Sequence, residues 1–232
     1  MTAPPGFGPR SRVALYYAPA EADPLWARAT AWLGRDPAGG AAPAPPDVPG
    51  LPEITRDAAT YGFHATLRPP MRLRDGATWA DLVAATRAVA AGTPAFALPM
   101  LAVTDVFGFL ALTETEPSAS LQAYADACVA GTEHLRAPPT EAELARRRRM
   151  GLARAEEANL IRWGYPYVFS TWFFHLTLTR RLSEAEHAVI RPAAEAWFED
   201  AAEDRRRVED ICLFVEPEPG APFVLAERVG LG

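Results

Sequence analysis

The sequence contains no lysine, so each of its 23 basic side chains is an arginine. Forty-six alanines, 23 prolines and 16 glycines accompany them, which fits a GC-rich genome and indicates that much of the arginine usage is compositional. Against 29 acidic residues, the arginines leave a net charge of −6. Because nonspecific binding along a nucleic-acid backbone draws on clustered positive charge, this balance argues against long nucleic acids and leaves a local anion site open.

Cysteine is almost absent. Cys128 and Cys212 lie far apart, and neither belongs to a Cys-x-x-Cys pair or to a Cys/His spacing typical of a metal site. This pattern excludes a disulfide-stapled miniprotein and favours a reducing compartment. With 49% hydrophobic and 22% charged residues, the 232-residue chain has enough apolar material for a sizeable core, in one large domain or two packed lobes.

Long apolar runs are also missing. The longest uncharged stretches, residues 88–104 and 163–179, are short and are interrupted by proline and glycine, so we expect no membrane span. The first residues contain no apolar segment of the kind found in signal peptides. These features predict a cytoplasmic protein with no membrane partner.

Hydrophobic periodicity and turn residues predict an α+β chain. Residues 36–52 are mostly Pro, Gly and Ala and are expected to form a loop. Strands are expected at residues 13–17, 61–67, 96–103, 107–113, 174–179, 211–216 and 223–229. Helices are expected at residues 23–33, 79–91 and 183–198, together with a helical region at 118–160 that is interrupted at Pro138-Pro139.

The order strand, helix, strand, strand occurs twice. Each copy opens with a matching segment, Phe63-His64-Ala65-Thr66-Leu67 in the first and Phe174-His175-Leu176-Thr177-Leu178 in the second. A chance second match to the four shared residue types is expected about once in a thousand chains of this length, so we interpret the match as an internal repeat. The repeat predicts two pseudo-symmetric lobes with antiparallel-rich sheets around a central cleft. Within a single bilobal domain over residues 1–232, the first unit is expected at 61–114, a helical connection at 118–160 and the second unit at 168–230.

The paired segments carry chemistry because residues two apart share one face of a strand. His64 and Thr66 share one face, and His175, Thr177 and Thr179 share the equivalent face of the second copy. If the lobes face each other, two imidazoles and two hydroxyls converge on one cleft. One imidazole could accept a proton while the other donates one, and the hydroxyls could bond the nonbridging oxygens of a phosphoester.

Other interpretations of these residues remain open. A pair of histidines could be part of a zinc site, but no Asp or Glu lies at a fixed strand spacing from either ring, so we expect no metal and no cofactor. His134 and His187 lie in helical segments among charged residues and are expected at the surface. The run from Arg146 to Arg149 is either a solvated face or a rim that attracts an anionic substrate.

The two His-x-Thr segments resemble those of the 2H phosphoesterase superfamily. Longer segments resemble the branch encoded in bacterial phosphonate-degradation operons: Trp32-Leu33-Gly34-Arg35-Asp36, Tyr61-Gly62 before the first motif, Pro69-Pro70 after it, and Trp163-Gly164-Tyr165-Pro166-Tyr167-Val168 before the second. The likeness runs from Val13 to the last predicted strands. That family often has Lys at the position of Arg68, where the charge is kept, and Gly at the position of Arg180.

The resemblance implies a metal-independent phosphoesterase in which His64 and His175 are the acid and base and Thr66 and Thr177 hold the phosphate. It leaves open which histidine is the base. Five tyrosines near the motif strands could stack on a sugar or base, or could pack in the core or at the rim: Tyr16, Tyr17, Tyr61, Tyr165 and Tyr167. As further substrate-binding candidates we consider Arg68, Tyr17, Tyr167 and Thr179.

Three functions compete at this point. The first is hydrolysis of a small cyclic phosphodiester, of ribose or nucleotide type, in phosphonate metabolism. The second is a 2′,3′-cyclic phosphodiesterase acting on RNA ends, which the net charge of −6 counts against. The third is a non-catalytic protein that binds a phosphate or phosphonate metabolite. In each case the partner expected from the resemblance is a small phosphorylated metabolite or an RNA end, and the oligomeric state is open.

Overall fold

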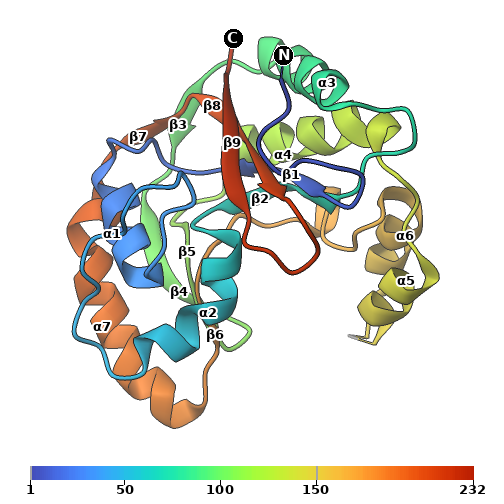
Figure 1. Ribbon diagram of the computed structural model, residues 1–232. Helices are drawn as coiled ribbons and strands as arrows, with labels where there is room; N and C mark the ends of the chain where they lie inside the picture. The colour runs from blue at the N-terminus through green and yellow to red at the C-terminus, as the bar shows by residue number, and fades with distance from the viewer. Residues whose placement is uncertain (1, 150) are drawn as a thin grey trace.

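The computed structural model describes residues 2–149 and 151–232. Within them, the chain forms two larger antiparallel sheets flanked by helices, so the expected α+β class is confirmed (Figure 1). The strands are β1 (Arg12–Tyr17), β2 (Ala65–Met71), β3 (Phe96–Leu98), β4 (Leu101–Val106), β5 (Phe109–Glu114), β6 (Leu176–Arg181), β7 (Arg206–Val208), β8 (Asp210–Glu216) and β9 (Val224–Gly230). The helices are α1 (Pro24–Leu33), α2 (Leu51–Tyr61), α3 (Trp79–Ala91), α4 (Ala119–Thr132), α5 (Glu141–Arg148), α6 (Arg154–Trp163) and α7 (Glu184–Glu203), with the short 3-10 helices η1 (Glu133–Leu135) and η2 (Phe169–Thr171).

The two copies of the repeat exchange their strands. The first sheet has the order β2-β1-β8-β9, so the motif strand of the first copy shares a sheet with the hairpin of the second. The second sheet has the order β4-β5-β6, which joins the hairpin of the first copy to the motif strand of the second. The equivalent strands β3 and β7 pair with each other. The sheets thus differ from our expectation that residues 61–114 and 168–230 would each build a lobe of their own.

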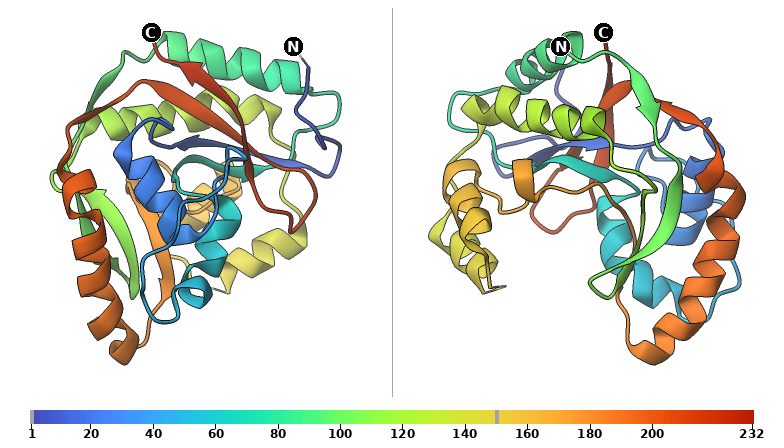
Figure 2. Two further views of the ribbon diagram at one scale, coloured as in Figure 1. Left: turned by 60° about the vertical axis from the view of Figure 1, so that its left-hand side comes forward. Right: turned by 180° about the vertical axis from the view of Figure 1, so that it is seen from behind.

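Each sheet is covered by its own helices. Helices α3 and α4 lie together along the first sheet, and α4 packs against β2 (Figures 1 and 2). Helix α7 packs against β4, and α2 packs against β6 on the second sheet. Helices α5 and α6 stand at the edge of the molecule beside the first sheet (Figure 2). No residue of α5 is buried, so this helix presents most of its length to solvent.

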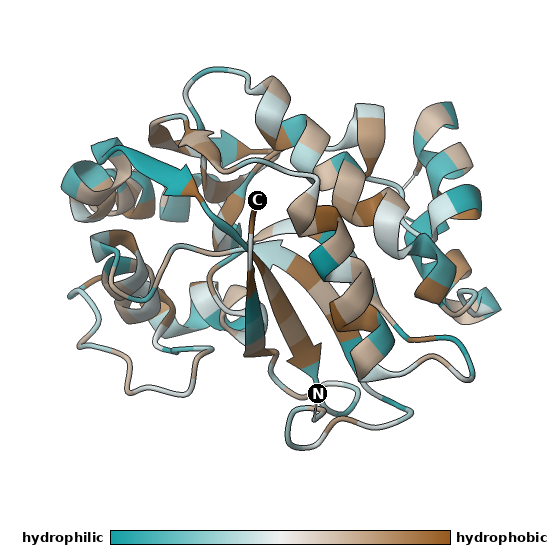
Figure 3. Ribbon diagram, turned by 90° about the horizontal axis from the view of Figure 1, so that it is seen from above, coloured by the Kyte–Doolittle hydropathy of each residue, from teal (hydrophilic) through white to brown (hydrophobic). Residues whose placement is uncertain are grey.

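The first sheet buries different residues on its two faces. Val13, Leu15 and Tyr17 of β1 belong to the main core. The alternate residues Ala14 and Tyr16 belong to a second, smaller apolar cluster on the opposite face. Figure 3 shows apolar strands in the middle of the molecule and more hydrophilic helices at its periphery. The alternation of β1 therefore turns Tyr16 and Tyr17 to opposite sides of the sheet.

Several predicted elements differ from those observed. Helix α2 was not predicted: it begins within the last two residues of the expected loop and continues through residues to which no element was assigned. Its first turn contains Pro52, where no amide donor is needed. The single strand expected at residues 96–103 is divided into β3 and β4 by Pro99, and β4 continues to Val106 before a turn at Phe107-Gly108. Strand β7 and the break between α5 and α6 were not predicted.

None of the helices in the described residues is both long enough and apolar enough to cross a membrane. Both cysteines are buried and free of disulfide bonds.

Candidate active site

The turn from α2 into β2 orients His64. Gly62 ends α2 with a φ of 77°, and a Cβ at this position would lie 2.8 Å from Pro37, so the turn requires glycine. The Gly62 carbonyl accepts a hydrogen bond of 2.9 Å from Nδ1 of His64. We assign the proton to Nδ1 from this bond, which leaves Nε2 as the free acceptor. The Thr66 hydroxyl lies 3.3 Å from that Nε2 atom.

The second motif repeats this arrangement. Nδ1 of His175 donates a 3.1 Å hydrogen bond to the carbonyl of Phe173, again two residues earlier in the chain. The Phe173 ring stacks on the imidazole with 4.5 Å between centroids. Nε2 of His175 makes no hydrogen bond within the described part of the chain. The pseudo-symmetry therefore extends to the tautomer, and each motif presents an unprotonated Nε2.

Two tryptophans fix the backbones of the motif strands. The indole of Trp172 donates a 2.8 Å hydrogen bond to the carbonyl of Thr66, which ties the segment before β6 to β2. The indole of Trp32 on α1 donates a 3.1 Å hydrogen bond to the carbonyl of Leu178 on β6. Because each motif strand is held by an indole from a distant part of the chain, the relative placement of the two strands depends on these bonds.

One cleft receives the four motif side chains. Its volume is about 480 Å³, and its lining includes His64, Thr66, His175 and Thr177. The expected convergence of both motifs on a single cleft is thus confirmed. The other lining residues are Arg12, Tyr16, Asp57, Ala58, Tyr61, Gly62, Pro70, Arg146, Arg147 and Tyr165.

Burial shifts the titration of both imidazoles. Desolvation lowers the pKa of His64 to about 4, against the raising effect of the Gly62 hydrogen bond, and a charge on His175 lowers it further. The His64 ring also stacks on Tyr16 with 3.8 Å between centroids. The pKa of His175 is lowered as well, again chiefly by desolvation. The free protein therefore holds both rings neutral at pH 7, ready to accept a proton.

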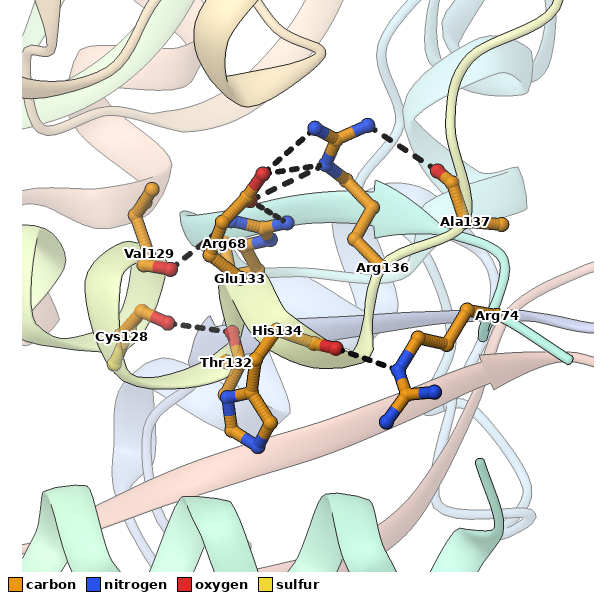
Figure 4. Close-up of polar contacts among 9 residues, drawn as sticks. All are labelled: Arg68, Arg74, Cys128, Val129, Thr132, Glu133, His134, Arg136 and Ala137. Carbon is orange, nitrogen blue, oxygen red and sulfur yellow. Dashed lines mark hydrogen bonds and ion pairs between the residues drawn. The ribbon is translucent and has the colours of Figure 1, made fainter. Parts of the chain in front are cut away.

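Arg68 was expected near the substrate but lies in the core, with 1% of its surface exposed. Register shifts against β1 mark a bulge at residues 67–68, which turns Arg68 to the buried side together with Leu67. Its guanidinium donates to the Val129 carbonyl at 3.1 Å and to the Glu133 carboxylate at 2.8 Å (Figure 4). Arg68 is a structural residue that joins β2 to the end of α4, and its expected role in substrate binding is wrong.

Three further substrate-binding candidates also lie elsewhere. The Thr179 hydroxyl is buried and accepts the Leu110 amide at 3.0 Å, where the irregular register between β5 and β6 leaves that amide without a strand partner. Tyr17 is buried on the core side of β1, near Phe174. Tyr167 packs edge-on against Tyr165, 5.7 Å between centroids, and does not line the cleft. None of the three faces the motif histidines.

The cleft is lined instead by three other tyrosines and an arginine: Tyr16, Tyr61, Tyr165 and Arg12. Arg12 shares the parity of Tyr16 on β1 and donates two hydrogen bonds to the Glu216 carboxylate of the adjacent strand β8. Tyr16 pairs with Thr66 in the register of β1 and β2, so the pairing turns both side chains to the cleft. In the sequence, the two-residue period of β1 indicates that Arg12 and Tyr16 share a face. Only the pairing with β2 shows that this face is the one that carries Thr66.

The structure also shows where the other histidines and the arginine run lie, and whether any side chains could hold a metal ion. Within the described residues, no group of three or more His, Cys, Asp or Glu side chains is placed to hold a metal ion. His134 is exposed, whereas His187 lies 2.7 Å from the Asp105 carboxylate. In the arginine run, Arg148 pairs with Glu157 at 2.8 Å, while Arg146 and Arg147 line the cleft.

Comparisons with known proteins find relatives along most of the chain. Two curated proteins named "Ribose 1,5-bisphosphate phosphokinase PhnN" are similar to it. The one from Janthinobacterium sp. (strain Marseille) is 41% identical over 94% of this chain and 50% of its own length, and the one from Laribacter hongkongensis (strain HLHK9) is 38% identical over 95% and 52%. The chain therefore spans about half the length of these relatives.

Two solved structures follow a similar course. E. coli LigT complexed with 3′-AMP is 16% identical with a TM-score of 0.46, and the match covers 96% of this chain and 98% of LigT. A protein described as a phosphoesterase is 14% identical with a TM-score of 0.42, over 95% of this chain and 98% of that one. At this level the likeness concerns the path of the chain and not its chemistry. The family model described as "Protein of unknown function (DUF1045)" matches residues 66–224, and the chain belongs to this family.

Proposed function

We propose that this protein is a metal-independent phosphoesterase that hydrolyses a small cyclic phosphodiester to a phosphomonoester. The observation that carries the proposal is the pair of imidazoles on one cleft, each with Nδ1 bonded to a carbonyl and Nε2 assigned as the unprotonated nitrogen. Two such groups can move one proton each on opposite sides of a phosphorus atom. The resemblance of both His-x-Thr segments to the 2H phosphoesterases supports the same chemistry.

The proposed reaction uses the two histidines in opposite roles. Nε2 of neutral His64 takes a proton from water as the water oxygen bonds to phosphorus. The P–O bond to the sugar breaks, and protonated His175 gives its proton to the departing oxygen. Water thus supplies an OH group to phosphorus and, through the two rings, a hydrogen to the sugar. We assign the base to His64 because desolvation lowers its pKa to about 4, so this ring stays neutral when its partner is charged.

Thr66 and Thr177 are proposed to donate hydrogen bonds to the nonbridging phosphate oxygens. Charge on these oxygens grows as the water attacks, and donors that are already oriented stabilise it without reorganising. The Thr66 hydroxyl lies 3.3 Å from Nε2 of His64, so both groups can reach the same phosphate.

We propose a ribose cyclic phosphate as the substrate class. The curated relatives are named for a kinase that acts on ribose 1,5-bisphosphate, and opening a cyclic phosphate of ribose yields a ribose phosphate of this chemical kind. The kinase activity itself is not proposed for this chain, since its 232 residues contain no lysine for a P-loop. A role in phosphonate metabolism follows from the operon resemblance of the sequence.

The proposal is tested by screening cyclic phosphodiesters and reading the products by phosphorus NMR. We expect turnover of a ribose cyclic phosphate that falls by about a hundred- to ten-thousandfold in His64→Ala and in His175→Ala. His134→Ala is the matched control, since His134 is exposed and does not line the cleft. Saturable binding without turnover of any cyclic phosphate would replace the enzyme with a metabolite-binding protein.

A further inference from the structure

A small recess adjoins the candidate active-site cleft beside α5. Its volume is about 50 Å³, enough for a few water molecules or one small anion. The recess and the cleft share five lining residues: Arg12, Pro70, Arg146, Arg147 and Tyr165. A ligand in the cleft can therefore extend one of its groups into the recess.

The recess concentrates positive charge in a protein whose net charge is −6. Five arginines and a single glutamate line it. Three of these arginines have carboxylate partners: Arg12 pairs with Glu216, Arg72 with Glu143 at 3.3 Å, and Arg136 with Glu133 at 2.7 Å. Because their charge is compensated, they shape the recess and contribute less to attracting an anion.

Arg146 and Arg147 differ from the other three. Neither forms an ion pair with a carboxylate of the described residues. The Arg147 guanidinium lies over the Tyr165 ring, 4.6 Å from its centroid, which orients the guanidinium without neutralising it. Helix α5, which carries both arginines, is fixed at its start by reciprocal bonds between Thr140 and Glu143. Two uncompensated cations are thus held at the junction of cleft and recess.

The Tyr16 hydroxyl is a second, independent sign of a ligand. The side chain is fully buried and lines the cleft, yet its hydroxyl oxygen has no hydrogen-bond partner within the described residues. An unpaired buried hydroxyl is costly, so a ligand that accepts its proton would relieve the cost. Tyr16 lines the cleft together with Arg12 and Tyr165, which also line the recess.

We propose that Arg146, Arg147 and the Tyr16 hydroxyl form a second phosphate subsite, so that the preferred substrate is a cyclic phosphodiester that also carries a terminal phosphate monoester. The proposal rests on the proposed function for the reacting phosphate. Two guanidinium groups and one hydroxyl supply several donors to a monoester dianion, and arginine is suited to bind phosphate in a bidentate way. Charge-assisted bonds of this kind are each worth about a tenfold to hundredfold in affinity.

The same chemistry could come from the neighbouring phosphate of an RNA chain. The structure favours a small molecule, because the recess is confined and the net charge of −6 opposes a longer polyanion. An oligonucleotide ending in a 2′,3′-cyclic phosphate is therefore included as a competing substrate. A value of kcat/KM for this oligonucleotide above that for the small bisphosphorylated substrate would overturn the small-molecule assignment.

The experiment compares a ribose cyclic phosphate with the same compound phosphorylated on C5. In the wild-type protein, kcat/KM should be about 10- to 100-fold higher for the C5-phosphorylated compound. Arg146→Gln and Arg147→Gln should each lower this ratio by about tenfold or more, and added salt should lower it in the wild type. Arg149→Gln is the matched control, since Arg149 is exposed in the same run and lines neither the cleft nor the recess. A ratio that is the same in all four proteins would overturn the subsite while leaving the phosphoesterase intact.

Binding of ribose 5-phosphate, measured by calorimetry, separates the two proposals. This compound has no cyclic ester, so its affinity reports the subsite without turnover. Binding that weakens in Arg146→Gln and Arg147→Gln but not in Arg149→Gln would support the subsite even if no cyclic phosphate were hydrolysed, in which case the proposed function would fail alone. Equal affinity in wild type and both variants would overturn the subsite.

Discussion

The pH dependence of hydrolysis tests the acid–base pair most directly. In the proposed reaction, the reactive form of the free protein carries one proton on the pair, with His64 neutral and His175 charged. Burial lowers the pKa of His64 to about 4 and also lowers that of His175 below its ordinary value of 6.5. We therefore expect kcat/KM to be highest at acidic pH, between the pKa of His64 and the lowered pKa of His175, and not at neutral pH.

The direction of each limb follows from which proton is missing. Below about pH 4 both rings are charged, so no base remains and kcat/KM should fall about tenfold per pH unit. Above the second pKa both rings are neutral, so no acid remains and kcat/KM should again fall about tenfold per unit. A bound phosphate anion favours the charged imidazole, so the alkaline limb of kcat should lie at higher pH than that of kcat/KM. The limbs belong to the coupled pair and not to one ring each.

The assay is a series of initial rates at constant ionic strength, with far-UV circular dichroism to confirm folding at each pH. Protonating His64 also favours the unfolded state, because the pKa of His64 is about 4 in the folded protein and near 6.5 in the unfolded one. Above pH 6.5, His64 is neutral in both states and its titration does not reduce the free energy of unfolding. Between pH 6.5 and pH 4, the free energy of unfolding falls by about 1.4 kcal/mol for each pH unit of acidification. A value of kcat/KM that rises steadily from pH 5 to pH 8 would refute the reasoning.

Further predictions concern the residues around this pair. Thr66→Val and Thr177→Val should each reduce kcat by about ten- to a thousandfold, and a wild-type rate in either would remove that hydroxyl from the site. Arg68→Ala should lower the free energy of unfolding by about 3 kcal/mol in urea titrations, because it removes a buried partner of Glu133, with kcat/KM unchanged. A large loss of kcat/KM at full stability would restore Arg68 to substrate binding. Turnover should survive dialysis against a chelator, and loss that zinc or manganese reverses would favour a metal mechanism.

The motif residues could be predicted because their placement depends on local geometry. The two-residue period of a strand was enough to put His64 with Thr66 and His175 with Thr177, and the repeat was enough to bring both pairs to one cleft. The same rule extended to Thr179 failed, and so did the interpretation of Arg68 as a substrate-binding residue. Each lies beside an irregularity in strand register, and one extra residue in a strand turns the following side chain to the other face.

The exchange of strands between the two copies could not be predicted. Sequence order suggests that consecutive strands pair, whereas β1 also pairs with β8, and β3 pairs with β7. These pairings join residues far apart in the chain and are decided by the packing of whole faces, which no local pattern contains. The same limit prevented a choice between Tyr16 and Tyr17, because the alternation of β1 separates the two side chains but does not say which face meets Thr66.

Pseudo-symmetry gives the site two like groups, and departures from symmetry let them act differently. Both imidazoles donate Nδ1–H to the carbonyl two residues earlier, so both would enter the proposed reaction as the same tautomer. Their surroundings differ: His64 stacks at 3.8 Å on Tyr16, itself fully buried, whereas His175 stacks on Phe173, which is 37% exposed. The deeper ring is harder to charge, so a single proton shared by the pair resides on His175. An acid and a base can thus be made from one repeated motif, since unequal burial is enough to separate their pKa values.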